Sequence, residues 1–176
     1  RLAQLASVER VGRLLVTPTS TGQILRAVAE EARSLTNGTR ATVMLRDEDT
    51  EDLIIRHAVG GPEPEKLIGA RLHPGSSKSG AVMARGRPER VNDLAADPEI
   101  NEEVRRFLGD PCNGAFAPLQ VRDRSVGALA VYGQAGGAPF TDDDLLVLQI
   151  LANQLAIALE NERLTGMLRE LAVLEE

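Results

Sequence analysis

The last part of the chain carries the clearest hydrophobic pattern. Residues 141–175 predict one long helix whose apolar positions fall on two opposite faces. The first face is formed by Leu148, Ala152, Leu155 and Leu159. The second repeats at a seven-residue step and is formed by Ile150, Ile157, Leu164 and Leu171. Since only one face can rest on the chain's own body, the second predicts a parallel homodimer held by a coiled coil.

Helix signals also mark the first forty residues. The spacing of apolar positions predicts a lead-in helix over residues 2–16, which Thr17-Pro18-Thr19 ends. Ser20-Thr21-Gly22-Gln23 is a capping-box pattern, so a second helix is expected from there. It should end at Asn37-Gly38, which suits a helix C-terminus.

Between these helices the pattern predicts short strands. Two hairpins are expected, one with strands 41–45 and 53–59 and one with strands 114–121 and 125–132, joined by Arg122-Asp123-Arg124. The second hairpin is the most apolar and is expected at the centre of the sheet. Shorter pieces are predicted as strands at 70–72 and 89–91 and as helices at 79–85 and 100–108. The fold class that follows is α+β.

Composition narrows the function. A chain of 176 residues is long enough for one full core, and aromatic residues make up only 2% of it, with no Trp. The formal net charge of −6 and the lack of aromatic stacking groups disfavour nucleic-acid binding, and the charge also disfavours direct contact with anionic membranes.

The number of cysteines indicates the cellular compartment of the protein. The single Cys112 excludes an intrachain disulfide framework and indicates a reducing, cytoplasmic setting. No stretch predicts a membrane span or a signal peptide. Because the chain begins at Arg1 rather than Met, we expect it to be a piece of a longer protein.

Six segments, in this order along the chain, resemble the GAF domain of bacterial signalling proteins. They are Ala41–Asp47, Gly80–Pro88, Val91–Leu94, Ala117–Leu119, Val126–Val131 and Phe140–Leu145. The resemblance implies a central antiparallel sheet of about six strands with helices on both faces. It also implies a ligand pocket under the loop-rich middle region. We therefore divide the chain into an N-terminal helix and linker (1–18), a GAF core (19–140) and a signalling helix (141–176) that starts in the core and projects as a coiled coil.

The tail carries a second resemblance. Residues 168–176 look like the linker before the phosphoacceptor helix of NarL-class sensor histidine kinases, including the dormancy-type haem sensors. This resemblance implies a two-component signalling protein as the parent. A GAF domain in front of a cyclase, phosphatase or transcription activator could end in a similar helix.

The chain lacks the residues with which several kinds of GAF domain bind a cofactor. Relatives that attach a bilin use a Cys usually followed by His, whereas Cys112 is followed by Asn113. In the dormancy-type sensors the haem ligand lies before the central hairpin, and residues 93–110 contain no His. His57 and His73 are the only histidines, and no metal-ligand spacing appears. We therefore expect no haem, bilin or metal.

Two further binding motifs are incomplete. Cyclic-nucleotide GAF domains carry an Asn-Lys pair where Val131-Tyr132-Gly133 stands, although Phe140 and Asp144 match their later motif. We expect these two residues to pack against and cap the last helix. The segment Gly75–Gly80 departs from the phosphate-loop order and is expected to be a turn at the pocket rim.

The leading hypothesis is a non-catalytic sensory module that couples binding of a small-molecule ligand or a partner to an output domain through the dimeric helix. Candidate ligand-binding residues, taken from the lid and the central strand, are Met83, Val91, Asn92, Arg105 and Phe116. The alternatives are a redox sensor or GAF-fold enzyme that uses Cys112, and a dimerisation spacer that binds no ligand.

Overall fold

A computed structural model describes residues 20–100, 102, 113–134 and 137–175. Its sheet has six antiparallel strands in the order β3-β2-β1-β6-β5-β4. The strands are β1 (Gly38–Arg46), β2 (Leu53–Gly60), β3 (Arg71–Leu72), β4 (Glu89–Val91), β5 (Gly114–Val121) and β6 (Arg124–Gln134). The α-helices of the described ranges are α2 (Thr21–Leu35), α3 (Lys78–Arg85) and α5 (Asp142–Leu174). Single 3-10 turns are η1 (Pro64–Lys66), η2 (Pro74–Ser76) and η3 (Leu94–Ala96). The predicted α+β class with a six-stranded sheet is confirmed.

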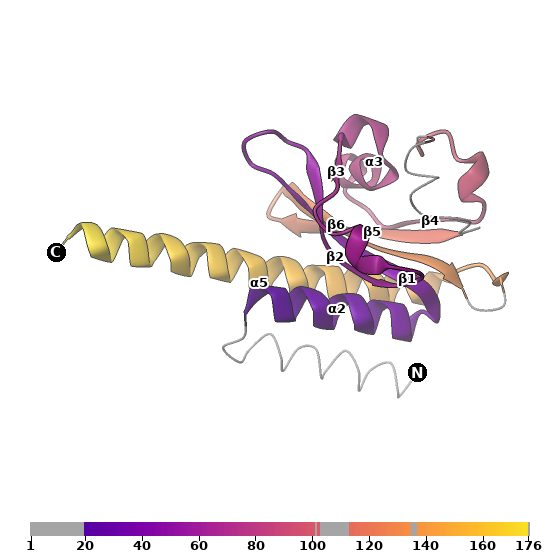
Figure 1. Ribbon diagram of the computed structural model, residues 1–176, viewed down its shortest axis with the longest axis horizontal. Coiled ribbons are helices and arrows are strands. Elements are labelled where there is room, and N and C mark those ends of the chain that lie inside the picture. Colours follow the sequence, from indigo (N-terminus) through magenta and orange to yellow (C-terminus); the bar gives the residue numbers. More distant parts are fainter. Residues whose placement is uncertain (1–19, 101, 103–112, 135–136, 176) are drawn as a thin grey trace.

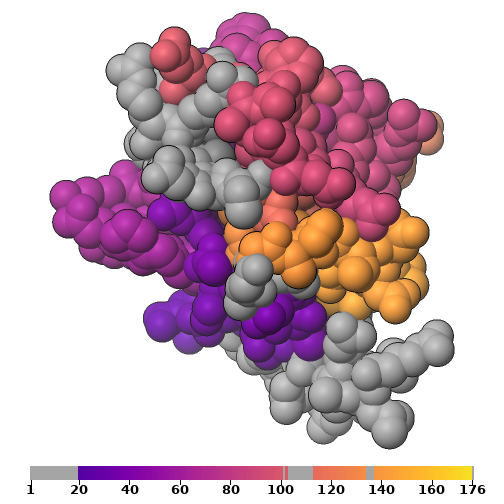
Figure 2. Space-filling model, turned by 90° about the vertical axis from the view of Figure 1, so that its right-hand side faces the viewer, coloured from indigo at the N-terminus to yellow at the C-terminus, as the bar shows by residue number. Residues whose placement is uncertain are grey.

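The sheet separates two layers of helices. Figure 1 shows α2 and α5 side by side on one face, with α3 and the 3-10 turns on the other. From the end opposite the projecting part of α5, Figure 2 shows the segments around residues 80–100 on one side of the orange strands and the violet α2 on the other. The predicted helix 2–16 and most of the predicted helix 100–108, with Arg105 and Cys112, lie outside the described residues.

Both long helices begin where their capping residues predicted. Ser20 caps α2 and Gln23 reaches back to the Ser20 amide, which completes the predicted capping box. Thr141 and Asp144 make the same reciprocal pair at the start of α5. Three aspartates in the first turn of α5 add favourable charge at the positive end of its dipole. At its other end, α2 is followed by Asn37 with a left-handed φ of 56°.

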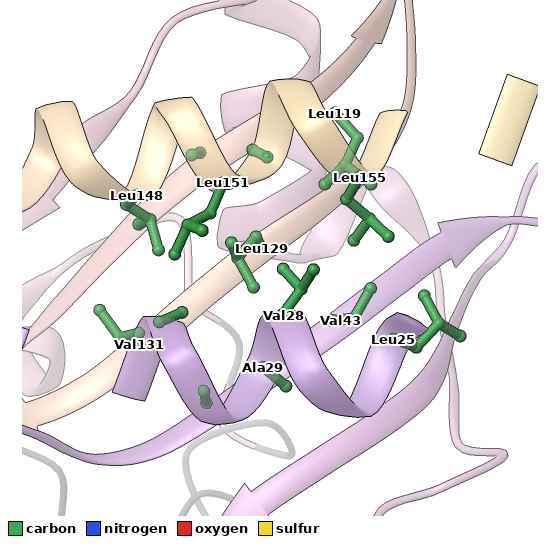
Figure 3. Close-up of a cluster of buried hydrophobic side chains, with 14 of the residues drawn as sticks. Leu25, Val28, Ala29, Val43, Leu119, Leu129, Val131, Leu148, Leu151 and Leu155 are labelled. Atoms are coloured by element: carbon green, nitrogen blue, oxygen red, sulfur yellow. The ribbon is translucent and has the colours of Figure 1, made fainter. Parts of the chain in front are cut away.

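The larger core lies between the sheet and the pair α2 and α5. Alternate residues of β1 and β6 point to this face, where Val43, Leu129 and Val131 meet α2 and α5 (Figure 3). The fully buried helix positions of this core are Val28, Ala29, Ala32, Leu148, Leu151, Ala152, Leu155 and Ala156. The predicted body-facing side of α5 is therefore confirmed, with Leu159 packed at its margin.

The other face of the sheet carries two smaller clusters. Met44 and Ala128 pack with Met83 of α3 in one of them. In the other, the rings of Phe116 and Tyr132 meet edge to face with centroids 5.6 Å apart. This face also carries α3, which packs over β5 and β6.

Both predicted hairpins form, but only one strand of the second hairpin, β6, lies at the centre of the sheet, where both were expected. The middle strands are β1 and β6, which pair along their length from Gly38↔Gln134 to Leu45↔Gly127. Strand β5 lies second from the edge, where the three-residue β4 covers it. Apolar composition did not reveal this order, because the neighbour of β6 is a strand about ninety residues earlier in the chain.

Helix α5 continues past the body. At 1.5 Å per residue its 33 residues span about 50 Å. Every described residue from Asn161 onward is exposed, and Figure 1 shows this end projecting from the sheet. None of the described helices combines the length and the apolar character needed to cross a bilayer.

Candidate functional site

A small cavity lies between α3 and the sheet. Its walls come from strands β1, β3, β5 and β6, from the start of α3 and from the segment after η3. The lining residues are Met44, Leu72, Ser77, Lys78, Ser79, Ile100, Phe116 and Tyr132. Its volume is about 10 Å³, which is about the space that one water molecule needs. In this conformation α3 therefore closes the site against larger ligands.

The start of α3 is fixed by local chemistry. The hydroxyl of Ser77 accepts a hydrogen bond from the Gly80 amide at 2.9 Å and caps the helix. Just before it, Nδ1 of His73 accepts from the Gly75 amide at 3.1 Å and supports the η2 turn. Gly80 lies so close to Pro74 that a Cβ there would be 2.0 Å from the Pro74 carbonyl oxygen. A glycine is thus required where α3 packs on the turn.

Tyr132 is the main polar group in the sheet wall of the cavity. Its side chain is 2% exposed, and this burial raises the pKa of the phenol to about 12, although the Thr42 hydroxyl and the Arg40 charge act in the opposite direction. The phenol is therefore neutral near pH 7. With the buried hydroxyls of Ser77 and Ser79, it gives the cavity hydrogen-bonding groups of no net charge.

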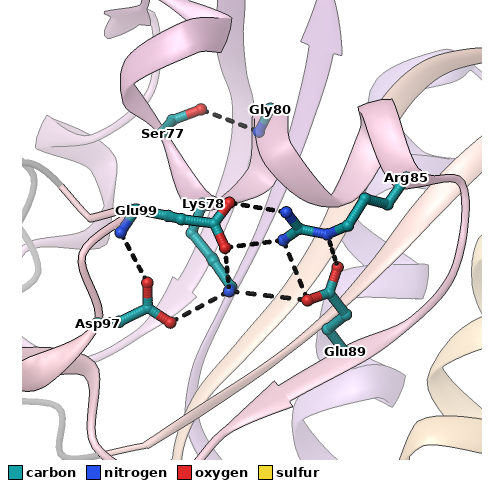
Figure 4. Close-up of polar contacts among 7 residues, drawn as sticks. All are labelled: Ser77, Lys78, Gly80, Arg85, Glu89, Asp97 and Glu99. Carbon is teal, nitrogen blue, oxygen red and sulfur yellow. Dashed lines mark hydrogen bonds and ion pairs between the residues drawn. The ribbon is translucent and has the colours of Figure 1, made fainter.

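A cluster of ion pairs holds α3 against the segment that follows η3. The Lys78 ammonium group lies 3.1 Å from Asp97 Oδ2 and 3.1 Å from Glu99 Oε1 (Figure 4). Arg85, at the other end of α3, contacts Glu99 at 2.9 Å and also Glu89 of β4. The cluster therefore ties both ends of α3 to the segments beside the cavity.

The opposite charges in this cluster shift the pKa values of their partners toward the charged forms. Burial alone would lower the pKa of Lys78, but hydrogen bonds to Glu99 and Asp97 outweigh it and raise the pKa above its ordinary value. The hydrogen bond from Arg85, aided by Lys78, holds the pKa of Glu99 below its ordinary value. Lys78 and Glu99 are thus both charged near neutral pH, which favours their ion pair.

The structure places the predicted ligand-binding residues at different distances from this cavity. Phe116 forms part of its wall. Met83 and Val91 lie in the adjoining apolar clusters on the same face of the sheet. Asn92 is exposed on the bend after β4, and Arg105 lies outside the described residues.

A comparison with protein families gives the assignment. The family model described as "GAF domain" matches residues 18–160, which is most of the chain. The chain belongs to the GAF domain family.

Solved GAF structures share its fold. The GAF domain of a phosphoenolpyruvate-protein phosphotransferase from Coxiella burnetii is 18% identical, with a TM-score of 0.82 over 93% of this chain and 96% of that one. The GAF-B domain of DevS from Mycobacterium smegmatis is 23% identical, with a TM-score of 0.66 over 86% and 99%. Free methionine-R-sulfoxide reductase from Neisseria meningitidis, solved with its substrate, is 19% identical, with a TM-score of 0.76 over 92% and 91%. These solved structures show the fold. The family match shows that the chain has the fold of a regulatory or sensory domain.

Other sequence-level expectations can be located within the GAF domain. Phe140 is buried in the larger core and Asp144 caps α5, as expected for residues that pack against and cap the last helix. His57 lies on β2, where Arg26 and Glu30 of α2 influence its charge, and neither it nor His73 lines the cavity. Among the described residues there is no group of three or more His, Cys, Asp or Glu placed to hold a metal ion.

Sequence reasoning missed most of the cavity wall. It placed the Gly75–Gly80 segment at the pocket rim, where Ser77, Lys78 and Ser79 do lie, but it assigned none of them to the site. The alternation along β6 could have pointed to Tyr132, because it places this aromatic residue on the face opposite α2 and α5, where its ring needs an apolar contact.

Proposed function

We propose that this GAF domain is the non-catalytic sensory module of a bacterial two-component protein, with a NarL-class histidine kinase as its output. It would act in the cytoplasm as a homodimer, without haem, bilin or metal. Binding of a ligand in the cavity under α3 would change the position of α5, and α5 would transmit this change to the output domain. The resemblance of residues 168–176 to the linker of such kinases supports this choice of output.

The observation that carries the proposal is the two-sided character of α5. Leu155 is 0% exposed against the sheet, whereas Ile157, two residues later, is 62% exposed. Ile150, Leu164 and Leu171 are exposed as well and continue the seven-residue stripe of Ile157. The other exposed large apolar residues of α5 are Leu146, Met167, Leu168, Val173 and Leu174. A second copy of the same helix can cover this stripe by seven-residue packing, which gives the module a parallel dimer and a direct connection to the next domain.

A route from the cavity to α5 runs through β5. Phe116 forms part of the cavity wall on one face of β5, and Ala117 and Leu119 pack in the core with α5 on the other. The Gln149 amide of α5 also donates to the Pro118 carbonyl at 3.1 Å. A ligand that enlarges the cavity would have to move α3 or β5. It would shift the position of α5 only by binding two arrangements of these elements with different affinity.

Light scattering and native mass spectrometry of the freshly purified chain test the proposal. We expect a dimer at micromolar concentration and a bound small molecule that is released on denaturation. The double variant Tyr132→Phe with Ser79→Ala removes two cavity hydroxyls and should lower the fraction of ligand-bound protein without changing the dimer. A monomeric wild type would contradict the dimeric module.

The cavity volume favours one alternative, a dimerisation spacer that binds no ligand. A mass spectrum with only the apo dimer, also after incubation with a cell extract, would support it. The second alternative uses Cys112 as a redox sensor or in a GAF-fold enzyme. A single cysteine cannot complete an intramolecular attack-and-resolution cycle. If Cys112→Ser abolished the response of the whole protein to oxidants, the redox alternative would replace our proposal.

A further inference from the structure

A second hollow, larger than the α3 cavity, lies where α5 leaves the body. Its volume is about 490 Å³, which is in the range of small-molecule sites. The walls come from three separate parts of the chain: the β1–β2 turn region, the β5–β6 turn and α5 itself. We call it the helix-exit groove. It is lined by residues 46, 48, 121–124, 126, 160 and 163.

Arginines dominate the lining of the helix-exit groove. Arg46, Arg122, Arg124 and Arg163 contribute four positive charges, against the carboxylates of Glu48, Asp123 and Glu160. Val121 and Val126 add an apolar surface that continues into the larger core. The groove therefore combines guanidinium groups with an apolar wall.

The ion pairs leave the guanidinium groups of the groove unequally partnered. Glu160 is engaged by Arg163, with contacts of 3.0 Å from Nε and 2.7 Å from Nη2. Arg46 and Arg124 share the single carboxylate of Glu51, at 3.2 and 3.5 Å. Two guanidinium groups thus face one carboxylate.

Two further observations concern guanidinium groups of the groove that lack an ion pair or a hydrogen-bond acceptor among the described residues. Arg122 makes no ion pair within the described part of the chain, although its charge acts on Glu160. The Nε atom of Arg46 is buried, and none of the described residues accepts a hydrogen bond from it. A buried donor of this kind is costly unless a ligand or water satisfies it.

We propose that the helix-exit groove binds a small organic oxyanion, a carboxylate or a phosphate monoester with a short alkyl chain. The guanidinium groups of Arg122 and Arg124 would hold the oxyanion, since planar guanidinium groups match such oxygens. The alkyl chain would lie on Val121 and Val126. This site is separate from the α3 cavity, and the proposal does not depend on the function of that cavity.

The location gives such a ligand a direct contact with α5. Glu160 lies at the last turn before every described helix residue is exposed, and Arg163 lies one turn further along the helix. An anion here would touch the strand turns and the helix at once. Its binding would therefore favour one position of α5 relative to the sheet.

NMR titration of the chain with butyl phosphate, and separately with butyrate, tests the site. We expect saturable shifts at the amides of residues 121–126 and at the Arg46 side-chain Nε, from at least one probe. The probe that binds identifies the oxyanion as phosphate or carboxylate. Absence of saturable shifts with both probes would overturn the proposal.

A pair of variants separates a specific site from general charge attraction. Arg122→Asn with Arg124→Gln should weaken binding at least tenfold, and Asn is chosen because Arg122 has a left-handed φ of 58° that Asn tolerates. The control Arg26→Gln with Arg56→Gln removes the same charge from α2 and β2 and should leave the affinity within twofold. Equal weakening by both pairs, with both proteins folded by their amide spectra, would also overturn the proposal.

Discussion

The Lys78 ammonium group lies 3.1 Å from the Asp97 carboxylate, and the two side chains are only 7% and 10% exposed. This contact joins the first turn of α3 to the segment after η3. Charges so far from water are tolerated only when they are paired. Lys78 therefore holds the first turn of α3 over the cavity, as Arg85 with Glu99 holds its last turn.

The first prediction follows from this pair. Lys78→Met should destabilise the folded chain by about 2–4 kcal/mol, because it leaves the carboxylates of Asp97 and Glu99 without their ammonium partner. Urea denaturation measures the change. Lys66→Met is the matched control, since Lys66 and its partner Glu63 are both well exposed, and it should cost less than about 1 kcal/mol. Equal stability of the two variants would show that the Lys78 pair contributes no more than a surface pair.

A second prediction concerns the exposed stripe of α5. Ile157→Glu with Leu164→Glu should convert the proposed dimer into a folded monomer, because the two changes bring unpaired charges into an apolar contact. Light scattering and circular dichroism measure mass and helix content. Thr165→Glu with Val173→Glu adds the same charge outside the seven-residue repeat and should remain dimeric. A dimer that survives the first pair of changes would rule out this stripe as the seam.

The third prediction concerns the opposite face of the same helix. Leu155→Glu with Leu159→Glu should unfold the domain, because Leu155 is fully buried among the core residues of Figure 3. An unpaired buried charge costs several kcal/mol, and a domain of this size has only about 5–15 kcal/mol in total. Loss of the cooperative thermal transition is the expected result. A stable, cooperative double variant would contradict the body-facing role.

A fourth prediction concerns haem. The purified protein should be colourless, and haemin should give no stoichiometric Soret band that depends on His57 or His73. His57 lies on β2 beside charges from α2, and His73 supports the η2 turn. Neither imidazole lines the cavity under α3. A band that disappears in His57→Ala or His73→Ala would refute this expectation.

The fifth prediction concerns pH. Burial, together with the nearby Arg26 charge, lowers the pKa of His57 below its ordinary value, while Glu30 partly opposes this. The unfolded chain should therefore take up this proton first, near pH 6.5. The stability that neutral His57 provides is complete above that pH and is lost as the pH falls through the folded pKa. NMR titration of the imidazole should show the lowered pKa, and His57→Gln should flatten the loss of stability between pH 7.5 and 5.5. A His57 pKa at or above 6.5 would contradict the prediction.

The sequence by itself determined the parts of this protein that depend on neighbouring residues. Ser20 with Gln23 and Thr141 with Asp144 placed both helix starts, because capping joins atoms three residues apart. The periodicity of α5 separated Leu155 from Ile157, because a helix turns about 100° per residue. The order of the GAF segments then implied the six-stranded sheet and the side that carries the cavity.

Only the tertiary structure decided which distant residues meet. It placed β1 beside β6 and brought Tyr132 of β6 to the same cavity as Ser77 and Phe116. It gave Lys78 carboxylate partners about twenty residues further along the chain, and it assembled the helix-exit groove from two turns and α5. The physical reason is that strand pairing, burial and charge pairing depend on the positions of segments in space, and helical and strand periodicities carry no information about those positions.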